Sequence, residues 1–124
     1  MDGPIRVLIV EDDPAIRELL ATLLRFEGWE ISLAEDGRAA LEAAARTTPD
    51  VVLVDVLMPG LSGHELCRRL KDGPDPPRVV MVSGLSDPGD ERDGRAAGAD
   101  AYLRKPFSPL ELLEAVSPGG GSFR

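Results

Sequence analysis

The sequence predicts an α/β protein built on a doubly wound, five-stranded parallel sheet with helices on both faces. Three runs of aliphatic residues, 7–10, 51–54 and 79–82, each end at a polar side chain. An unbroken apolar run indicates a parallel strand buried on both faces, because a half-exposed strand would alternate polar and apolar residues. Helical segments lie between these runs, and all eleven prolines fall outside the expected strand and helix interiors. Such alternation of strands and helices predicts a parallel sheet.

The first half of the chain supports two helices and a weaker strand. Asp13 is a suitable N-cap and Pro14 a suitable first residue for a helix that we expect to close at Gly28. Residues 29–34 alternate in polarity, as an edge strand does. A second helix is expected over about 38–46. Its predicted inward stripe comprises Ala40, Leu41, Ala44 and Ala45.

A third helix is expected to begin after Ser62. Ser62 and Glu65 have the spacing of a capping box, in which each side chain bonds the other residue's main-chain amide. This helix would bury Leu66, Cys67 and Leu70. A proline-rich loop over 71–78 then leads to the apolar strand that ends at Ser83.

The last third of the chain predicts two further helices around a short strand. Residues 87–88 begin a fourth helix that ends at Gly98 and contains two glycines, so it should be the most loosely held. The strand is 101–104. Ser108 begins a final helix of only about eight residues through a second capping box. The Pro/Gly-rich segment 117–124 is expected to be a flexible tail.

Burial predicts the order of the strands. The three fully apolar strands should be central and the two more polar strands should lie at the edges. With right-handed crossovers the order 2-1-3-4-5 satisfies this, and the switch point then falls between strands 1 and 3. Glu11, Asp12 and Asp55 should therefore share one crevice, with Ser83 and Lys105 at neighbouring strand ends.

Three carboxylates in one crevice require a positive partner or a proton on one acid. At 4 Å and an effective dielectric of about 20, each pair repels by roughly 4 kcal/mol. Oxygen ligands favour a hard cation such as Mg²⁺. Lys105 and Ser83 add the ammonium and hydroxyl groups that phosphoryl oxygens bind. The set indicates phosphoryl transfer onto an aspartate.

Composition limits the other classes of function. The chain has 124 residues with 43% hydrophobic content, which fits one domain, and it has no apolar segment long enough to span a membrane. A single cysteine excludes a disulfide scaffold, and the first residues do not resemble a signal peptide, so a cytoplasmic location is expected. A net charge of −8 argues against direct binding to nucleic acid or anionic lipid.

Four motifs together resemble the receiver domain of bacterial two-component response regulators, the CheY-like proteins. They are Val10–Pro14, Asp55 followed by Met58-Pro59 and Gly63, Val82–Gly84, and Lys105–Phe107. The resemblance covers about residues 4–116, which we therefore expect to be the receiver domain. It implies a flavodoxin-like topology and a signalling domain that catalyses its own phosphorylation and dephosphorylation.

The resemblance also implies roles for individual residues. Asp55 would be the phospho-acceptor. Asp12, Asp55 and the backbone carbonyl of Leu57 would bind Mg²⁺, for which Mn²⁺ can substitute, and Glu11 would act through water. Lys105, placed before a cis proline, would bind the phosphoryl group.

Switching and hydrolysis residues are implied in the same way. Ser83 would be the switch hydroxyl, and Tyr102 the aromatic that changes rotamer when Ser83 moves. Leu57 and Leu85 flank the path of the hydrolytic water in receivers. Since neither leucine can orient water by hydrogen bonding, we expect a long-lived phosphorylated state.

The implied partners are proteins. A sensor histidine kinase or phosphotransfer protein would donate the phosphoryl group, and a downstream protein target or effector domain would read the face formed by helix 4, strand 5 and helix 5. Because no DNA-binding or catalytic domain follows in this sequence, we expect either a single-domain regulator that acts by protein contact or a receiver cut from a longer protein. Because the last helix is short, we expect a monomer, with a phosphorylation-dependent dimer as the alternative.

Three other classes of protein share part of this pattern. A flavodoxin-like cofactor carrier would present backbone amides, not acids, in its first loop. A haloacid-dehalogenase-type phosphatase would carry a second aspartate where this chain has Leu57. The strongest alternative is a receiver-like module that binds proteins without phosphorylation, and the intact set of acids, Ser83 and Lys105 argues against it.

Overall fold

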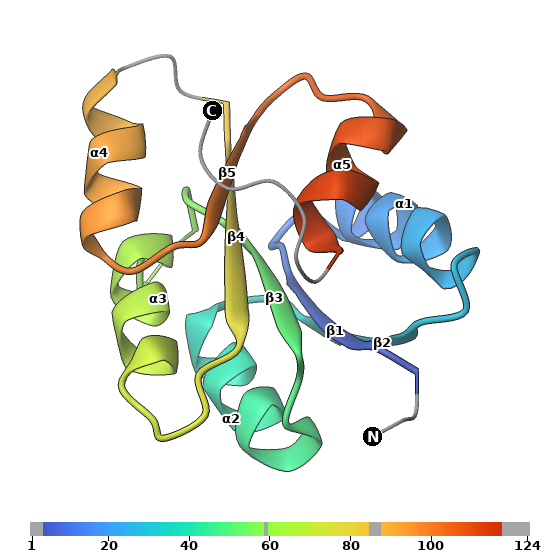
Figure 1. Ribbon diagram of the computed structural model, residues 1–124, viewed down its shortest axis with the longest axis horizontal. Coiled ribbons are helices and arrows are strands. Elements are labelled where there is room, and N and C mark those ends of the chain that lie inside the picture. Colours follow the sequence, from blue (N-terminus) through green and yellow to red (C-terminus); the bar gives the residue numbers. More distant parts are fainter. Residues whose placement is uncertain (1–3, 59, 85–87, 118–124) are drawn as a thin grey trace.

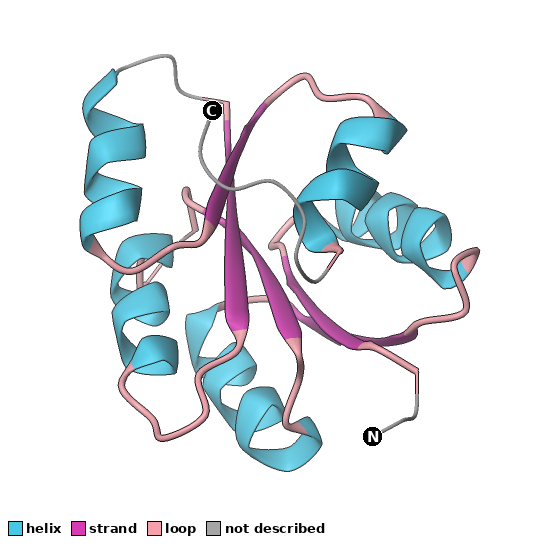
Figure 2. Cartoon of the chain, in the orientation of Figure 1, coloured by secondary structure: helices cyan, strands magenta, loops and turns pink. Residues whose placement is uncertain are grey.

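The computed structural model confirms the predicted α/β fold and its sheet order. It describes residues 4–58, 60–84 and 88–117, and for residues 88–90 the backbone alone. Five parallel strands form one sheet in the order β2-β1-β3-β4-β5 (Figures 1 and 2). In chain order the elements are β1 (Arg6–Val10), α1 (Pro14–Arg25), β2 (Glu30–Ala34), α2 (Gly37–Thr47), β3 (Val51–Asp55), α3 (Gly63–Lys71), β4 (Arg78–Ser83), α4 (Pro88–Ala96), β5 (Ala101–Arg104) and α5 (Pro109–Val116).

Two apolar cores lie on opposite faces of the sheet. Helices α1 and α5 cover one face, and α2, α3 and α4 cover the other (Figure 1). Alternate residues of β1 serve the two cores: Val7 and Ile9 pack toward α1 and α5, whereas Leu8 and Val10 pack toward the other three helices. This double burial is the reason for the unbroken apolar runs in the central strands. Strand β2 is more exposed, as expected at an edge.

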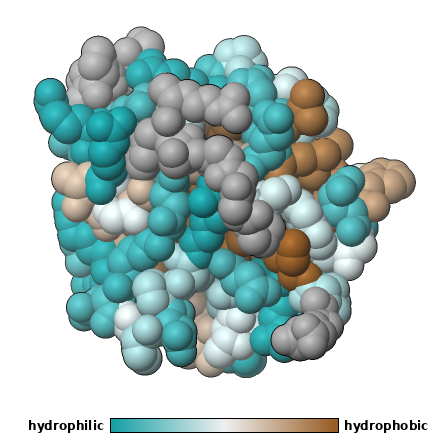
Figure 3. Space-filling view, viewed as in Figure 1, coloured by the Kyte–Doolittle hydropathy of each residue, from teal (hydrophilic) through white to brown (hydrophobic). Residues whose placement is uncertain are grey.

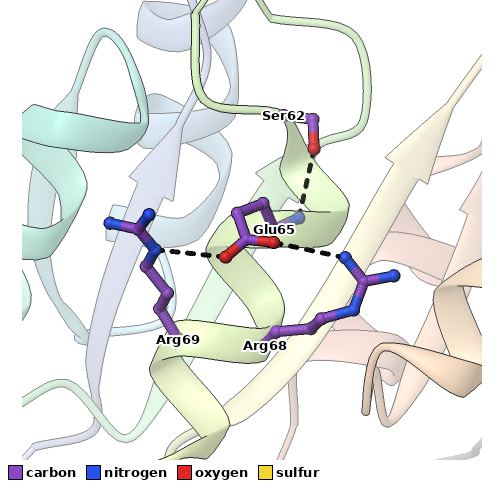
Figure 4. Close-up of polar contacts among 4 residues, drawn as sticks. All are labelled: Ser62, Glu65, Arg68 and Arg69. Atoms are coloured by element: carbon purple, nitrogen blue, oxygen red, sulfur yellow. Dashed lines mark hydrogen bonds and ion pairs between the residues drawn. The ribbon is translucent and has the colours of Figure 1, made fainter.

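Serine caps begin α3 and α5, but only one of the two predicted capping boxes is complete. Ser108 and its glutamate make both hydrogen bonds. In α3, Ser62 accepts from the main-chain amide of Glu65, whereas the Glu65 carboxylate pairs with Arg68 and Arg69 (Figure 4). The prediction for Glu65 was wrong because two guanidinium groups, three and four residues along the helix, attract its carboxylate away from the helix start.

Two expected details of the first helices also change. Helix α1 ends at Arg25, and Gly28 forms the turn that follows, with φ +80°. In α2 the buried alanines are Ala40, as expected, and Ala43, whereas Ala45 is exposed. The first residue of α2, Gly37, packs closely against Leu61, since a Cβ there would lie 2.8 Å from the Leu61 side chain.

Helix α4 packs tightly at one of its glycines. A Cβ on Gly94 would lie 3.0 Å from Sδ of Met81 and 3.3 Å from the ring of Tyr102. The absence of a side chain therefore lets the helix approach β4 and β5 closely. The sequence had suggested only that this glycine weakens the helix.

The turn between α4 and β5 is anchored to the end of α3. Asp100 accepts hydrogen bonds from Lys71 Nζ at 2.5 Å and from the Val79 amide at 2.8 Å. Lys71 Nζ also donates to the carbonyl of Pro77 at 2.8 Å. These contacts join α3, the start of β4 and the start of β5 at the edge of the sheet opposite the strand carboxyl ends.

The surface is unevenly apolar. Figure 3 shows apolar side chains gathered on the side where α1 and α5 lie in Figure 1. Leu19 and Phe26, on and just after α1, and Leu110 on α5 are large apolar residues that are exposed. No helix within the described ranges combines the length and apolar character needed to cross a lipid bilayer.

Candidate functional site

Three carboxylates meet at the carboxyl edge of the sheet. Glu11 directly follows β1, Asp12 is the next residue, and Asp55 is the last residue of β3. One oxygen from each can be chosen so that all lie within 4.8 Å of one another. Glu11 and Asp55 are buried, with 3% and 8% of their surfaces exposed, and Asp12 is exposed. The neighbouring positions of β1 and β3 in the sheet bring these acids together.

The carboxylate of Asp55 is held by contacts on both oxygens. Oδ1 accepts from the main-chain amide of Leu57 at 3.0 Å, and Oδ2 lies 3.5 Å from Lys105 Nζ. The turn after Asp55 packs against the first residue of α3, since a Cβ on Gly63 would lie 2.7 Å from the Asp55 carbonyl oxygen. The site thus fixes the orientation of Asp55 and leaves the side chain of Leu57 59% exposed beside it.

Lys105 and Ser83 are joined through the main chain. Ser83 is buried at the end of β4, and its carbonyl accepts from the Lys105 amide at 2.8 Å. The Lys105–Pro106 peptide bond is cis, as the resemblance implied. Tyr102 is partly buried and packs against the core beneath α4. Leu85 lies outside the described residues.

The burial and charge of the site change the pKa of Glu11. Burial, together with hydrogen bonding and repulsion from Asp55, raises the pKa of Glu11 to about 7. The amide of Asp13 opposes this rise by donating to Glu11 Oε2 at 3.1 Å. The cluster therefore tends to retain a proton near neutrality.

The donor set fits a hard divalent cation. All three side chains offer carboxylate oxygens, and one of them is open to solvent. Mg²⁺ prefers such ligands and keeps several of its waters. A cation would also relieve the repulsion that raises the pKa of Glu11.

Two contributors to this site were not assigned a role from sequence. Gly63 permits α3 to approach the turn after Asp55. Arg17, one turn into α1, donates from Nη1 to the carbonyl oxygen of Glu11 at 2.8 Å. Its position gave a usable signal, because helix side chains lean toward the amino end and those of the first turns can reach the preceding loop.

Comparison with known proteins identifies this arrangement. The family described as the response regulator receiver domain matches residues 7–117. The chain belongs to this family. Phosphorylation and Mg²⁺ binding are typical of receiver domains, and response regulators interact with sensor kinases.

Relatives of the receiver include mycobacterial regulators. The response regulator MprA of Mycolicibacterium vanbaalenii is 44% identical over 110 residues, which are 89% of this chain and 48% of that protein. The DNA-binding response regulator MtrA of Mycolicibacterium smegmatis is 40% identical over 111 residues, 90% of this chain and 48% of that protein. The receiver thus spans about half the length of these relatives.

Solved structures resemble the receiver throughout its fold. A putative response regulator from Chloroflexus aurantiacus superposes with a TM-score of 0.84 at 37% identity, covering 90% of this chain and 93% of its own. The chemotaxis response regulator CheY4 of Vibrio cholerae superposes with a TM-score of 0.84 at 32% identity. The match covers 93% of this chain and 100% of the CheY4 chain.

The close approach of Gly63 to Asp55 predicts that even a methyl group there disturbs the site. We expect Gly63→Ala to destabilise the receiver by about 1–3 kcal/mol, because the new Cβ would meet main-chain atoms of the Asp55 turn. Urea denaturation measures this loss. Gly73→Ala is the matched control, since a Cβ there meets nothing within 4 Å. Equal stability of the two variants would contradict the prediction.

The raised pKa of Glu11 predicts that the metal-free receiver loses stability as pH increases. Below its ordinary value of 4.5 the carboxyl is protonated in both the folded and unfolded states. Between 4.5 and about 7 the unfolded state has released the proton while the folded state keeps it, so stability falls across this range and the loss is complete above 7. We expect Glu11→Gln to stabilise the protein by up to about 3 kcal/mol at pH 8 and by little at pH 4.5.

Urea denaturation in EDTA at both pH values checks this expectation. Glu42→Gln, a change at an exposed residue of α2, is the control. If the stabilisation by Glu11→Gln does not increase with pH, ionisation of the buried Glu11 carboxyl does not destabilise the fold and the prediction is contradicted.

Proposed function

We propose that Asp55 accepts a phosphoryl group from a phosphohistidine on a sensor histidine kinase or phosphotransfer protein. The observation that carries this proposal is the environment of Asp55: a buried carboxylate at the end of a central strand, beside two further acids and 3.5 Å from Lys105 Nζ. A buried carboxylate with one firmly held oxygen and an ammonium group beside the other suits nucleophilic attack on phosphorus.

In the proposed reaction a carboxylate oxygen of Asp55 forms a bond to phosphorus as the phosphorus–nitrogen bond to the donor imidazole breaks. The imidazole leaves with the bonding electron pair and takes a proton. The ammonium of Lys105 and the hydroxyl of Ser83 then bind phosphoryl oxygens. Attack of water on phosphorus later returns the carboxylate and releases inorganic phosphate.

The receiver site is proposed to hold Mg²⁺, with Mn²⁺ as a substitute. Asp12, Asp55 and the carbonyl of Leu57 would bind the ion directly, and Glu11 would bind it through water. When bound, the ion neutralises charge that gathers on the phosphoryl oxygens during transfer. The all-oxygen donor set and the raised pKa of Glu11 support this assignment.

The output is proposed to be a protein contact controlled by Ser83 and Tyr102. Movement of Ser83 toward the phosphoryl group would let Tyr102 change rotamer and alter the face of α4, β5 and α5. That face would bind a downstream protein or effector domain, in the cytoplasm, with the receiver a monomer before phosphorylation. The net charge of −8 disfavours direct contact with nucleic acid through the receiver unit, proposed to be residues 4–116.

Phosphorylation can be tested by intact mass. After incubation with acetyl phosphate and Mg²⁺, we expect a gain of one phosphoryl group that is absent from Asp55→Asn and from a sample in EDTA. Circular dichroism establishes that every sample is folded. If folded wild-type protein gains no mass, the proposal fails and the phosphorylation-independent binding module becomes the better account.

We further propose that Leu57 and Leu85 prolong the phosphorylated state. Leu57 lies next to Asp55 with an exposed side chain that cannot orient a water by hydrogen bonding. An amide there would supply one hydrogen bond to the attacking water. We expect Leu57→Asn to lower the barrier by roughly 1 kcal/mol, which is about a fivefold faster loss of phosphate.

Phosphate release after removal of the phosphodonor measures this rate. Leu19→Asn is the control, because Leu19 on α1 has the same exposed fraction of 59%. The Leu57→Asn, Leu85→Glu double variant should be faster still, and an unchanged rate in that variant would remove the idea.

A further inference from the structure

The loop that carries Glu11 and Asp12 is held by hydrogen bonds to β2, to α1 and within the loop itself. It consists of residues 11–13, between β1 and α1. The amide of Glu11 donates to Ala34 at the end of β2 at 3.1 Å, and Glu11 Oε2 accepts from the Asp13 amide. Asp13 in turn caps α1 by accepting from the amides of Ala15 and Ile16. The loop is therefore held at Glu11 and at Asp13, the residues on either side of Asp12.

Arg17 completes this set from the helix. Its side chain is half-buried, and Nη1 donates to the carbonyl oxygen of Glu11 at 2.8 Å. A hydrogen bond from a charged donor is stronger than one between neutral groups. The hydrogen bond from Arg17 thus connects the loop to α1, and the hydrogen bond to Ala34 connects it to β2.

The positive charge of Arg17 and its hydrogen bond to Glu11 should affect metal binding in opposite directions. A guanidinium so near a cation site repels the cation, so its charge alone weakens metal binding. Its hydrogen bond has the opposite effect if it holds Glu11 and Asp12 in the geometry that the ion requires. The two effects differ in sign, which allows an experiment to separate them.

We propose that Arg17 is a positioning residue of the receiver site, which preorganises the acidic loop for a divalent cation by fixing the carbonyl of Glu11. The proposal rests on the proposed function, since it assumes that the acids bind Mg²⁺. Groups that orient metal ligands typically change metal affinity by 10- to 100-fold when removed.

The test measures the affinity of the folded protein for Mg²⁺ by calorimetry and for Mn²⁺ by electron paramagnetic resonance. We expect Arg17→Met, which keeps an unbranched apolar stem, to weaken binding of both ions about tenfold. Arg17→Lys retains the charge and a donor and should recover part of the loss. Arg25→Met is the matched control, because it removes the same charge from the same helix far from the loop; its affinity should be unchanged or slightly higher.

Each outcome decides the proposal. Affinity in Arg17→Met that equals or exceeds that of the wild type would overturn it and leave Arg17 as a nearby charge. If Arg17→Met does not fold, Arg17→Gln is measured in its place with the same expectation. If the wild-type protein binds neither ion, the proposed function fails at the metal and the positioning role fails with it. If the wild type binds and only the Arg17 result disagrees, the proposed function stands.

Discussion

Repulsion among three carboxylates that lie within 4.8 Å of one another is the constraint around which this receiver is arranged. Hydrogen bonds from main-chain amides hold two of these carboxylates in place. The amide of Leu57 holds Asp55, and the amide of Asp13 holds Glu11. Lys105 is the nearby ammonium group. Burial, with hydrogen bonding and repulsion from Asp55, raises the pKa of Glu11 to about 7, so the folded site favours a proton on this acid.

The same arrangement connects the acids to the opposite half of the domain. Ser83 and Lys105 are joined through the main chain, and Lys105 follows directly after β5, the strand that carries Tyr102. Tyr102 lies against Gly94 of α4. The far end of α4 is anchored through Asp100 and Lys71. The acids are thus connected to α4 through β5, and the turn after α4 is attached to α3.

Much of the fold could be predicted because local and global signals agree. Apolar runs located the central strands, and their burial fixed the strand order, which in turn brought together Glu11, Asp12 and Asp55. The errors arose where several partners compete for one group. Glu65 had a capping position available but bonds two arginines instead. The contact between Arg17 and Glu11 depends on side-chain reach across a loop; the position of Arg17 early in α1 indicates it, whereas periodicity and composition do not.

Gly94 has a consequence for engineering the domain. Replacing glycines in helices by alanine is a common route to thermostable proteins, and it gains about 0.4–1 kcal/mol where space allows. Here the added methyl would press on Met81 and Tyr102, so a steric clash would oppose the gain from reduced backbone entropy in the unfolded state. A designer would instead raise helix propensity at an exposed poor helix former, such as Asp93, and leave the glycine in place.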